Sequence, residues 1–284
     1  MLKQRVITAL VLLAILLPAM FYANTIPFTI VMLVFMAAGA WEWGRMNGLK
    51  GAGAIAMGAV CLALCGLSWA LGWVNTSLPW LWTIAGAAWV LGSAALLRVG
   101  VAGWPSIPVA VRLVGGVLAL WVAWLAVVQA RNIGINFLLS ILVLVWVADI
   151  FAYFSGRAFG LKFTKNKLAP SISPGKSWEG VWGGMLGVIV LALVWSWADR
   201  HYGASVLSFY SVLQSRGLWF LLLAAVFMAA MSVVGDLVES LIKRSVGVKD
   251  SSGLLPGHGG VLDRIDALLP TLPLAMMLSS FVHP

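Results

Sequence analysis

The sequence predicts an all-α, polytopic integral membrane protein with about nine transmembrane helices. Of its 284 residues, 62% are hydrophobic and 10% are charged, and the mean hydropathy is +1.01. A soluble core of this size could not bury so much apolar surface, so the bilayer is the expected solvent. Runs long enough to cross about 30 Å of hydrocarbon as helices occur near 6–23, 26–45, 52–74, 79–97, 113–130, 135–156, 180–198, 218–240 and 265–282.

The first run follows Lys3 and Arg5, as a secretory signal would, but it is long, lacks a clear small-x-small cleavage site and precedes many further runs. We therefore expect a retained anchor. The next four runs carry little chemistry. Glu42 and Arg45 have the spacing of a pair on a helix surface, and two cysteines four residues apart in the third run are expected to fill space.

The basic residues predict the orientation. With loops assigned alternately to the two sides, 15 of the 18 Lys and Arg residues fall on one side and three, Arg131, Arg200 and Arg216, on the other. The N-terminus is therefore expected in the cytoplasm and the C-terminus on the opposite side, which requires an odd number of spans. The expected location is a bacterial inner (plasma) membrane.

The net charge of +9 does not indicate nucleic-acid binding, because the cations lie in short loops without a soluble basic domain. Anionic lipids or phosphate ligands are better partners. We expect one membrane domain over 1–284, with scaffold spans in 1–130 and catalytic spans and cytoplasmic loops in 131–284. Polar residues concentrate after residue 148 near one face, which predicts a metal and phosphate site at the cytoplasmic side of the C-terminal half.

The first polar cluster lies at the end of the sixth run. Asp149, Tyr153, Gly156 and Arg157 share one helix face, because they fall at i, i+4, i+7 and i+8. An ionisable residue inside a span is costly unless it is paired or functional. An Asp149–Arg157 pair is the simplest structural interpretation.

The second cluster is the loop 161–184, which contains four lysines. Pro174 and Gly175 favour a turn. Ser177 and Gly180 suit a helix start whose free N–H groups attract anions. An ordinary cytoplasmic loop would also explain the lysines, and the SPGKS string lacks the upstream glycine and strand of a Walker loop.

The third cluster contains paired carboxylates on the last two spans. Asp236, Glu239 and Lys243 share one helix face, and Asp263 and Asp266 share another where the ninth span begins. Carboxylates at a helix N-terminus gain from the helix dipole, which is a structural explanation for the latter two. The same spacing, with Asp236 across a tight loop, also places several hard oxygen ligands around a Mg²⁺ ion.

Glycines in the intervening loop allow close backbone approach. Gly257, Gly259 and Gly260 permit a ligand to come near the backbone or form an anion-binding nest. His258 is expected to be a polar contact or a loop brace, because no second His or Cys lies near it.

Carboxylates, fixed cations and glycine-rich backbone at a membrane surface suit the meeting of two phosphorylated molecules. Two anions repel, so a divalent metal and Lys or Arg side chains are needed to neutralise them. A lipid phosphate is already an ionised nucleophile and needs no general base. Catalysis would then depend on positioning and electrostatics.

The segment 240–266 resembles the signature of the phosphatidate cytidylyltransferases, also called CDP-diacylglycerol synthases. The pattern is S-x-apolar-K-R, four residues, K-D, then P-x-H-G-G and D-R-x-D. Its fixed positions are Ser240, Lys243, Arg244, Lys249, Asp250, Pro256, His258, Gly259, Gly260, Asp263, Arg264 and Asp266. A second family motif is similar to KLAPSISPGKSWEG, with Lys167, Pro170, Ser173, Pro174, Lys176, Ser177 and Trp178 in place.

The resemblance implies transfer of a cytidylyl group from CTP to phosphatidic acid, giving CDP-diacylglycerol and pyrophosphate. It implies that Asp236 and Asp263 hold a paired metal centre, assisted by Asp266, with Mg²⁺ and a monovalent cation such as K⁺ as a second candidate ion. Lys243 would contact phosphate. From the residues themselves, we expect Lys249 and Arg264 near the triphosphate or the lipid phosphate, and Lys176 and Ser177 near the nucleotide. Further substrate contacts are expected at Arg244, Asp250, His258, Gly259 and Gly260.

The sequence leaves one alternative function open and disfavours two others. A cytidylyltransferase for another lipid acceptor stays open, because acyl tails leave little mark on an apolar groove. A membrane transporter is less favoured, because no internal repeat is evident and transporter sites lie near the bilayer midplane. A CDP-alcohol phosphotransferase is disfavoured, because its D-G-x-x-A-R run is absent. The expected partners are CTP, phosphatidic acid and membrane lipids, with a homodimer as a further candidate.

Overall fold

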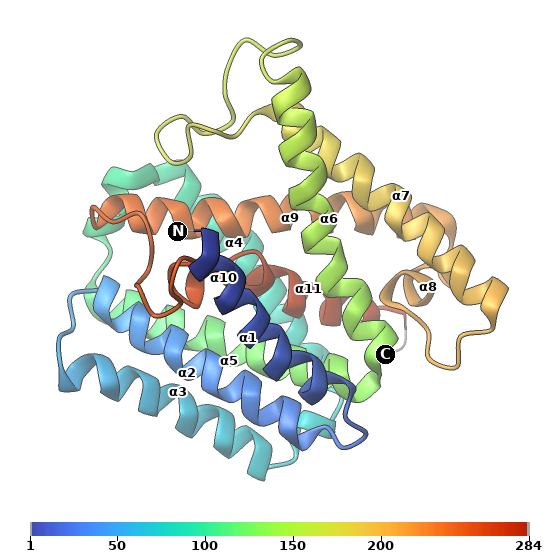
Figure 1. Cartoon of the computed structure of the whole chain (residues 1–284), viewed down its shortest axis with the longest axis horizontal. Helices are drawn as coiled ribbons and strands as arrows, with labels where there is room; N and C mark the ends of the chain where they lie inside the picture. The colour runs from blue at the N-terminus through green and yellow to red at the C-terminus, as the bar shows by residue number, and fades with distance from the viewer. Residues whose placement is uncertain (1, 283–284) are drawn as a thin grey trace.

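The computed structural model describes residues 2–282 as a bundle of helices (Figure 1), with no β-strand in that range. Eight of the helices described there are long and apolar enough to cross a membrane, in agreement with the first eight predicted spans. They are α1 (Leu2–Phe21), α2 (Ile26–Met46), α3 (Ala52–Ala70), α4 (Pro79–Gly103), α5 (Val109–Ile133), α6 (Ile135–Phe159), α7 (Trp178–Tyr202) and α9 (Leu218–Ser245).

The predicted ninth span is not one long helix. It is divided into α10 (Leu262–Ile265) and α11 (Leu268–Ser280). Two local features explain the break: Pro270 lacks the N–H that would bond the carbonyl of Asp266, and the Asp266 side chain accepts the N–H of Ala267 at 2.7 Å. The 13 residues of α11 extend only about 20 Å at 1.5 Å per residue.

The chain still passes from one end of the bundle to the other between α10 and residue 281. Asp263 in α10 bonds Lys243 near the end of α9, whereas Arg216, just before α9 begins, donates to the carbonyl of Phe281. In Figure 1, α10 accordingly lies toward the left end of α9 and the short helix α8 (Phe209–Gln214) toward its right end. Residues 262–281 therefore follow the path that the predicted ninth span required.

The centre of the bundle is α11, which packs against α4, α5 and α9. Its residues from Pro270 to Met276 are buried. Two short 3-10 turns, η1 (Trp73–Asn75) and η2 (Trp104–Ser106), join the helices of the N-terminal half. The α11 segment is thus surrounded by protein, which accounts for its tolerance of two proline residues.

Helices α6 and α7 form a tightly packed hairpin. Ideal Cβ atoms at Gly180 and Gly184 would each lie 2.9 Å from a backbone carbonyl of α6, so glycine is required for this approach. The two helices converge on the loop of residues 160–177, at the top of Figure 1. The hairpin holds that loop over the end of the bundle where α9 ends.

The opposite end has its own polar contacts. Buried Arg131 donates to the carbonyls of Met20 and Tyr22, at 2.7 and 2.8 Å. Asp199 accepts from Asn136 at 2.9 Å. Arg131 and Arg216 are two of the three cations that the loop assignment places apart from the polar clusters. Both lie at the end of the bundle opposite Lys243 and Asp263, in agreement with that assignment.

Candidate active site

The predicted clusters come together at one end of the bundle. Lys176, from the loop before α7, pairs with Asp236 of α9 at 2.7 Å. Lys243, two turns further along α9, lies 2.6 Å from Asp263 and 2.5 Å from Glu239. These ion pairs join three separate segments of the chain: the loop before α7, α9 and α10. The first and last of the paired residues, Lys176 and Asp263, are 87 positions apart in the sequence.

Asp263 is the most constrained carboxylate of this group. Its Oδ1 accepts from Lys243, and its Oδ2 accepts from the N–H of Gly260 at 2.7 Å, the N–H of Ser251 at 2.9 Å and the Ser251 hydroxyl at 3.0 Å. Burial alone would raise the pKa of Asp263, but the hydrogen bonds from Lys243, Gly260 and Ser251 hold it below its ordinary value. The side chain is therefore held as an anion in one orientation.

The loop glycines are needed for this geometry. Gly259 has φ +83°, and an ideal Cβ there would lie 2.5 Å from Oδ2 of Asp263. An ideal Cβ at Gly260 would overlap the Ser251 hydroxyl and lie 2.5 Å from Oε1 of Glu42. The predicted close backbone approach is thus present, but the N–H of Gly260 is directed to Asp263.

His258 stabilises a turn through its backbone N–H, which donates to the carbonyl of Leu255 at 2.8 Å. Its Nδ1 is buried and has no hydrogen-bond partner in the part of the chain that the structure describes. This bond would form with any residue except proline, so the predicted role of the imidazole as a polar contact or a loop brace stays a prediction.

The predicted surface pair of Glu42 and Arg45 is wrong. Glu42 is fully buried and accepts four hydrogen bonds from the loop of residues 251–262. Arg45 lies over the ring of Trp41 instead, with its Cζ 4.8 Å from the ring centroid. The two side chains leave α2 in different directions, because a spacing of three residues makes a pair possible without requiring one.

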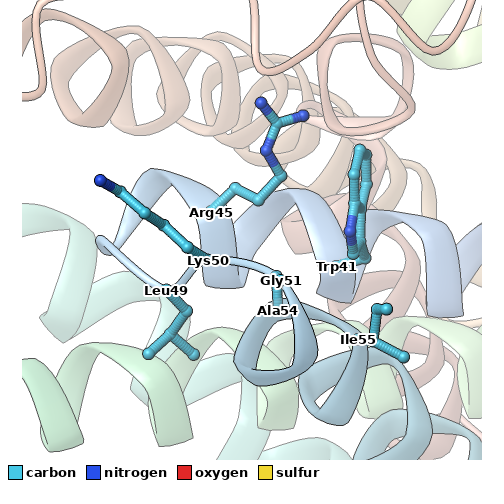
Figure 2. Close-up of a pocket in the computed structure, with 7 residues that line it drawn as sticks. All are labelled: Trp41, Arg45, Leu49, Lys50, Gly51, Ala54 and Ile55. Carbon is cyan, nitrogen blue, oxygen red and sulfur yellow. The ribbon is translucent and has the colours of Figure 1, made fainter.

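Figure 2 shows a pocket near the C-terminal end of α2, bordered by Trp41, Arg45 and Lys50. The pocket is lined by α2, α3 and the loop between them, and contains none of the carboxylates of the site. It is therefore separate from the chemistry described above.

Other predictions for the second cluster hold in part. Ser177 caps α7 as predicted, accepting the N–H of Gly180 at 3.2 Å. That hydroxyl is buried against the α6–α7 contact, so it is not free in this arrangement to bind an anion. Glu179, which the sequence did not single out, holds the loop by accepting from Thr164 N–H and hydroxyl, both at 2.8 Å.

The predicted Asp149–Arg157 pair is also wrong. Arg157 donates to the hydroxyl of Tyr153 at 3.1 Å. Asp149 instead lies within electrostatic reach of Asp236 and Lys176. Asp149 is exposed and makes no ion pair within residues 2–282, so a role for it in the site stays a prediction.

The remaining predicted site residues lie at the rim. Arg244 donates weakly to the carbonyl of Ile172 at 3.4 Å, which connects α9 to the loop before α7. Lys249, Asp250 and Arg264 are exposed, and no ion pair within residues 2–282 involves them. They surround the site without joining its internal network.

The donor set suits a hard cation. Asp266 lies within electrostatic reach of Asp236 and Lys243, so several carboxylates share one region. Oε1 of Glu239 is buried and finds no hydrogen-bond partner among the described residues. No three acidic, His or Cys side chains within 2–282 converge into a ready cluster. The predicted grouping of Asp236, Asp263 and Asp266 around one ion therefore stays a prediction, and a Mg²⁺ ion held there would need water or substrate phosphates to complete its shell.

Fold and site define a polytopic membrane protein with a carboxylate–lysine cluster at one end of its helices. The chain belongs to the cytidylyltransferase family, whose model matches residues 3–282, and is thus a nucleotidyltransferase. A phosphatidate cytidylyltransferase of Pseudomonas aeruginosa is 40% identical, covering 96% of this chain and 95% of the relative. A phosphatidate cytidylyltransferase of Haemophilus influenzae is 36% identical, covering 99% of this chain and 100% of the relative. One of Thermotoga maritima is 42% identical, covering 52% of this chain and 50% of the relative.

Proposed function

We propose that the protein is a phosphatidate cytidylyltransferase, which joins CTP and phosphatidic acid to give CDP-diacylglycerol and pyrophosphate in phospholipid biosynthesis. The observation that carries the proposal is that two ion pairs, Lys176–Asp236 and Lys243–Asp263, lie two turns apart on α9 at one end of a membrane bundle. Relatives of that name match nearly the whole chain. Both substrates are anionic, and such a cluster can hold anions together.

In the proposed reaction, a phosphate oxygen of phosphatidic acid attacks the α-phosphorus of CTP. A new P–O bond forms between the two phosphates, and the bond between the α-phosphorus and the bridging oxygen breaks. Pyrophosphate leaves with that electron pair. The attacking oxygen is already ionised, so the site needs to position the phosphates and to neutralise their charge, without a general base.

Lys176 and Lys243 are the cations best placed for this work. Each is paired with a carboxylate here, Lys176 with Asp236 and Lys243 with Asp263. A phosphate that enters the site competes for the ammonium groups and thereby frees carboxylate oxygens. Lys249, Arg244 and Arg264 at the rim are proposed to attract the triphosphate or the lipid phosphate.

We assign Asp236 and Asp263, assisted by Asp266, to hold Mg²⁺, with K⁺ as a candidate second ion. When bound, a divalent ion supplies positive charge that offsets the negative charge of the phosphates. Oε1 of Glu239, which is buried and has no hydrogen-bond partner within residues 2–282, adds an oxygen that the sequence did not assign. Lys243 pairs with both Glu239 and Asp263, and its positive charge offsets the repulsion between these two carboxylates.

The site is proposed to face the cytoplasm of a bacterial inner membrane, because 15 of the 18 Lys and Arg residues belong to that side in the loop assignment. CTP is a soluble nucleotide, so its binding site must open to the aqueous phase. Phosphatidic acid approaches from the bilayer. A homodimer stays a prediction about the assembly.

A product assay tests the proposed function. Purified protein in detergent is expected to release pyrophosphate from CTP only when phosphatidic acid and Mg²⁺ are both present. A different acceptor, such as another phosphorylated lipid, would support turnover in place of phosphatidic acid if the acceptor has been misassigned. Solute flux in vesicles without CTP turnover would favour a transporter and contradict the proposal.

Replacement of Gly260 by alanine tests the loop geometry. The added methyl group would overlap the Ser251 hydroxyl and approach Oε1 of Glu42, so the loop must shift and carry Asp263 with it. Turnover is expected to fall at least about tenfold, as for loss of a supporting contact around a metal site. Gly253→Ala is the matched control, because a Cβ there meets nothing within 4 Å; equal activity of the two variants would contradict the argument.

A further inference from the structure

A buried carboxylate from the N-terminal half reaches the candidate active site. Glu42 lies near the end of α2, in the part of the chain expected to be scaffold, and is 0% exposed. Its Oε1 accepts from the Ser252 hydroxyl at 2.6 Å and the N–H of Val261 at 2.9 Å. Its Oε2 accepts from the Ser251 hydroxyl at 3.1 Å and the N–H of Leu262 at 2.9 Å.

The pattern of donors requires a carboxylate. Each oxygen of Glu42 receives one backbone N–H, from Val261 or Leu262, and a backbone N–H cannot turn around to accept. A glutamine in either orientation would set its NH₂ group against one of these N–H groups. Alanine would leave both N–H groups and both hydroxyls without this partner in a buried place. The site is therefore built for two acceptor oxygens on one side chain.

The bonds of Glu42 lead directly to Asp263. The Ser251 hydroxyl lies between the two carboxylates, 3.1 Å from Oε2 of Glu42 and 3.0 Å from Oδ2 of Asp263, which share its single proton. Val261 and Leu262, whose N–H groups Glu42 holds, begin the turn of α10 that carries Asp263. Asp263 in turn bonds Lys243, which pairs with Glu239. Glu42 thus fixes both the backbone that bears Asp263 and a hydroxyl that orients it.

We propose that Glu42 is a positioning residue of the active site, an anionic clamp from α2 that sets the orientation of Asp263 through Ser251 and the start of α10. It contacts neither substrate in this scheme. The inference rests on the proposed cytidylyl transfer for its catalytic consequence, whereas the clamp itself is a property of the loop. Supporting groups around metal-binding carboxylates affect metal affinity or activity when they are removed.

Glu42→Gln in the full-length protein is the primary test. Turnover of CTP with phosphatidic acid is expected to fall at least about tenfold, with a matching rise in the Mg²⁺ concentration that gives half-maximal activity. Amide hydrogen exchange measured without substrate is expected to rise in residues 251–262 and to stay unchanged in α4 and α5. Arg45→Gln, one turn away on the same helix and over the Trp41 ring, serves as control and should leave activity and exchange unchanged.

A pair of serine variants keeps the proposal testable if Glu42→Gln does not fold. Ser251→Ala removes the hydroxyl shared with Asp263, whereas Ser252→Ala removes a hydroxyl that contacts Glu42 and the N–H of Leu254 only. We expect the loss of turnover and the rise in Mg²⁺ requirement to be larger for Ser251→Ala. Equal effects would overturn the proposal, as would Glu42→Gln with wild-type Mg²⁺ requirement and exchange.

The two hypotheses fail in different ways. If the wild-type protein does not consume CTP, the proposed function is wrong, but hydrogen exchange in residues 251–262 still tests the clamp. If the wild type is active and Glu42→Gln matches it in turnover, Mg²⁺ requirement and exchange, the clamp is wrong and the function stands. Lower activity with unchanged Mg²⁺ requirement and unchanged exchange would also overturn the positioning role.

Discussion

Asp263→Asn is expected to lower turnover by at least about 100-fold, comparable to the loss of a major electrostatic contribution. The side chain is nearly isosteric, but every group that faces Asp263 donates: Lys243 on Oδ1, and Gly260 N–H with the Ser251 N–H and hydroxyl on Oδ2. An amide NH₂ in either position would oppose at least one donor and would lose the charge that attracts Mg²⁺. Pyrophosphate release from CTP measures the effect.

Asp199→Asn provides a matched control for that variant. Asp199 lies at the opposite end of the bundle and also accepts several hydrogen bonds, from Asn136, Ser208 and Ser211. Its replacement is expected to lower the thermal unfolding temperature while the folded fraction keeps its activity. If Asp263→Asn retains near-normal turnover, or loses no more than Asp199→Asn per folded molecule, Asp263 is not part of the reacting site.

Lys243→Met is expected to have the second large effect, because it leaves two carboxylates without their common cation. The ammonium group lies 2.5 Å from Glu239 and 2.6 Å from Asp263, and the lysine side chain is 13% exposed. Removing one partner of a buried ion pair costs about 3–5 kcal/mol. We expect a lower unfolding temperature and a loss of turnover of at least about 100-fold, since the cation that would contact phosphate is also gone.

Calorimetry and the product assay separate the two consequences for Lys243→Met. Lys165 is an exposed lysine of the loop before α7. The variant Lys165→Met is the control for the loss of one positive charge and is expected to behave as wild type. Mg²⁺ that restores thermal stability to Lys243→Met without restoring turnover would support both roles. Wild-type turnover in Lys243→Met would remove the lysine from the reaction.

The membrane class and most of the spans could be predicted, because both depend on local sequence. A helix that crosses a bilayer satisfies its own backbone hydrogen bonds, so a run of apolar residues is a sufficient signal. The eight long helices in the described range agree with this reasoning. The ninth run differs, because its helix is interrupted at Asp266 and Ala267 and is surrounded by other helices.

The C-terminal site could also be anticipated in outline. Charged residues are costly near hydrocarbon, so carboxylates and lysines at the ends of apolar runs indicate a function. Lys243 of α9 pairs with Asp263 of α10, which brings two of the predicted site residues together. Lys176 pairs with Asp236 although it belongs to the other motif.

Glu42 shows where this reasoning stops. Three residues separate it from Arg45, which is a sufficient reason to expect a surface pair. Its partners, from Ser251 to Leu262, lie more than 200 positions away in the chain. The residues next to Glu42 in the sequence do not indicate whether its carboxylate faces solvent or a loop so far along the chain. The same holds for Asp149 and Arg157, which form no ion pair in the part of the chain that the structure describes, because Arg157 donates to Tyr153.

By itself, the sequence determined the solvent of this protein, the approximate course of its helices and the chemical composition of its site, since hydrophobicity and residue type are local properties. Only the tertiary structure decided which carboxylate faces which donor. Hydrogen bonds act over about 3 Å, and the direction of a side chain is settled by packing between segments that are distant in the chain. Glu42 therefore lies at the candidate site because α2 packs against the loop of residues 251–262, which precedes Asp263.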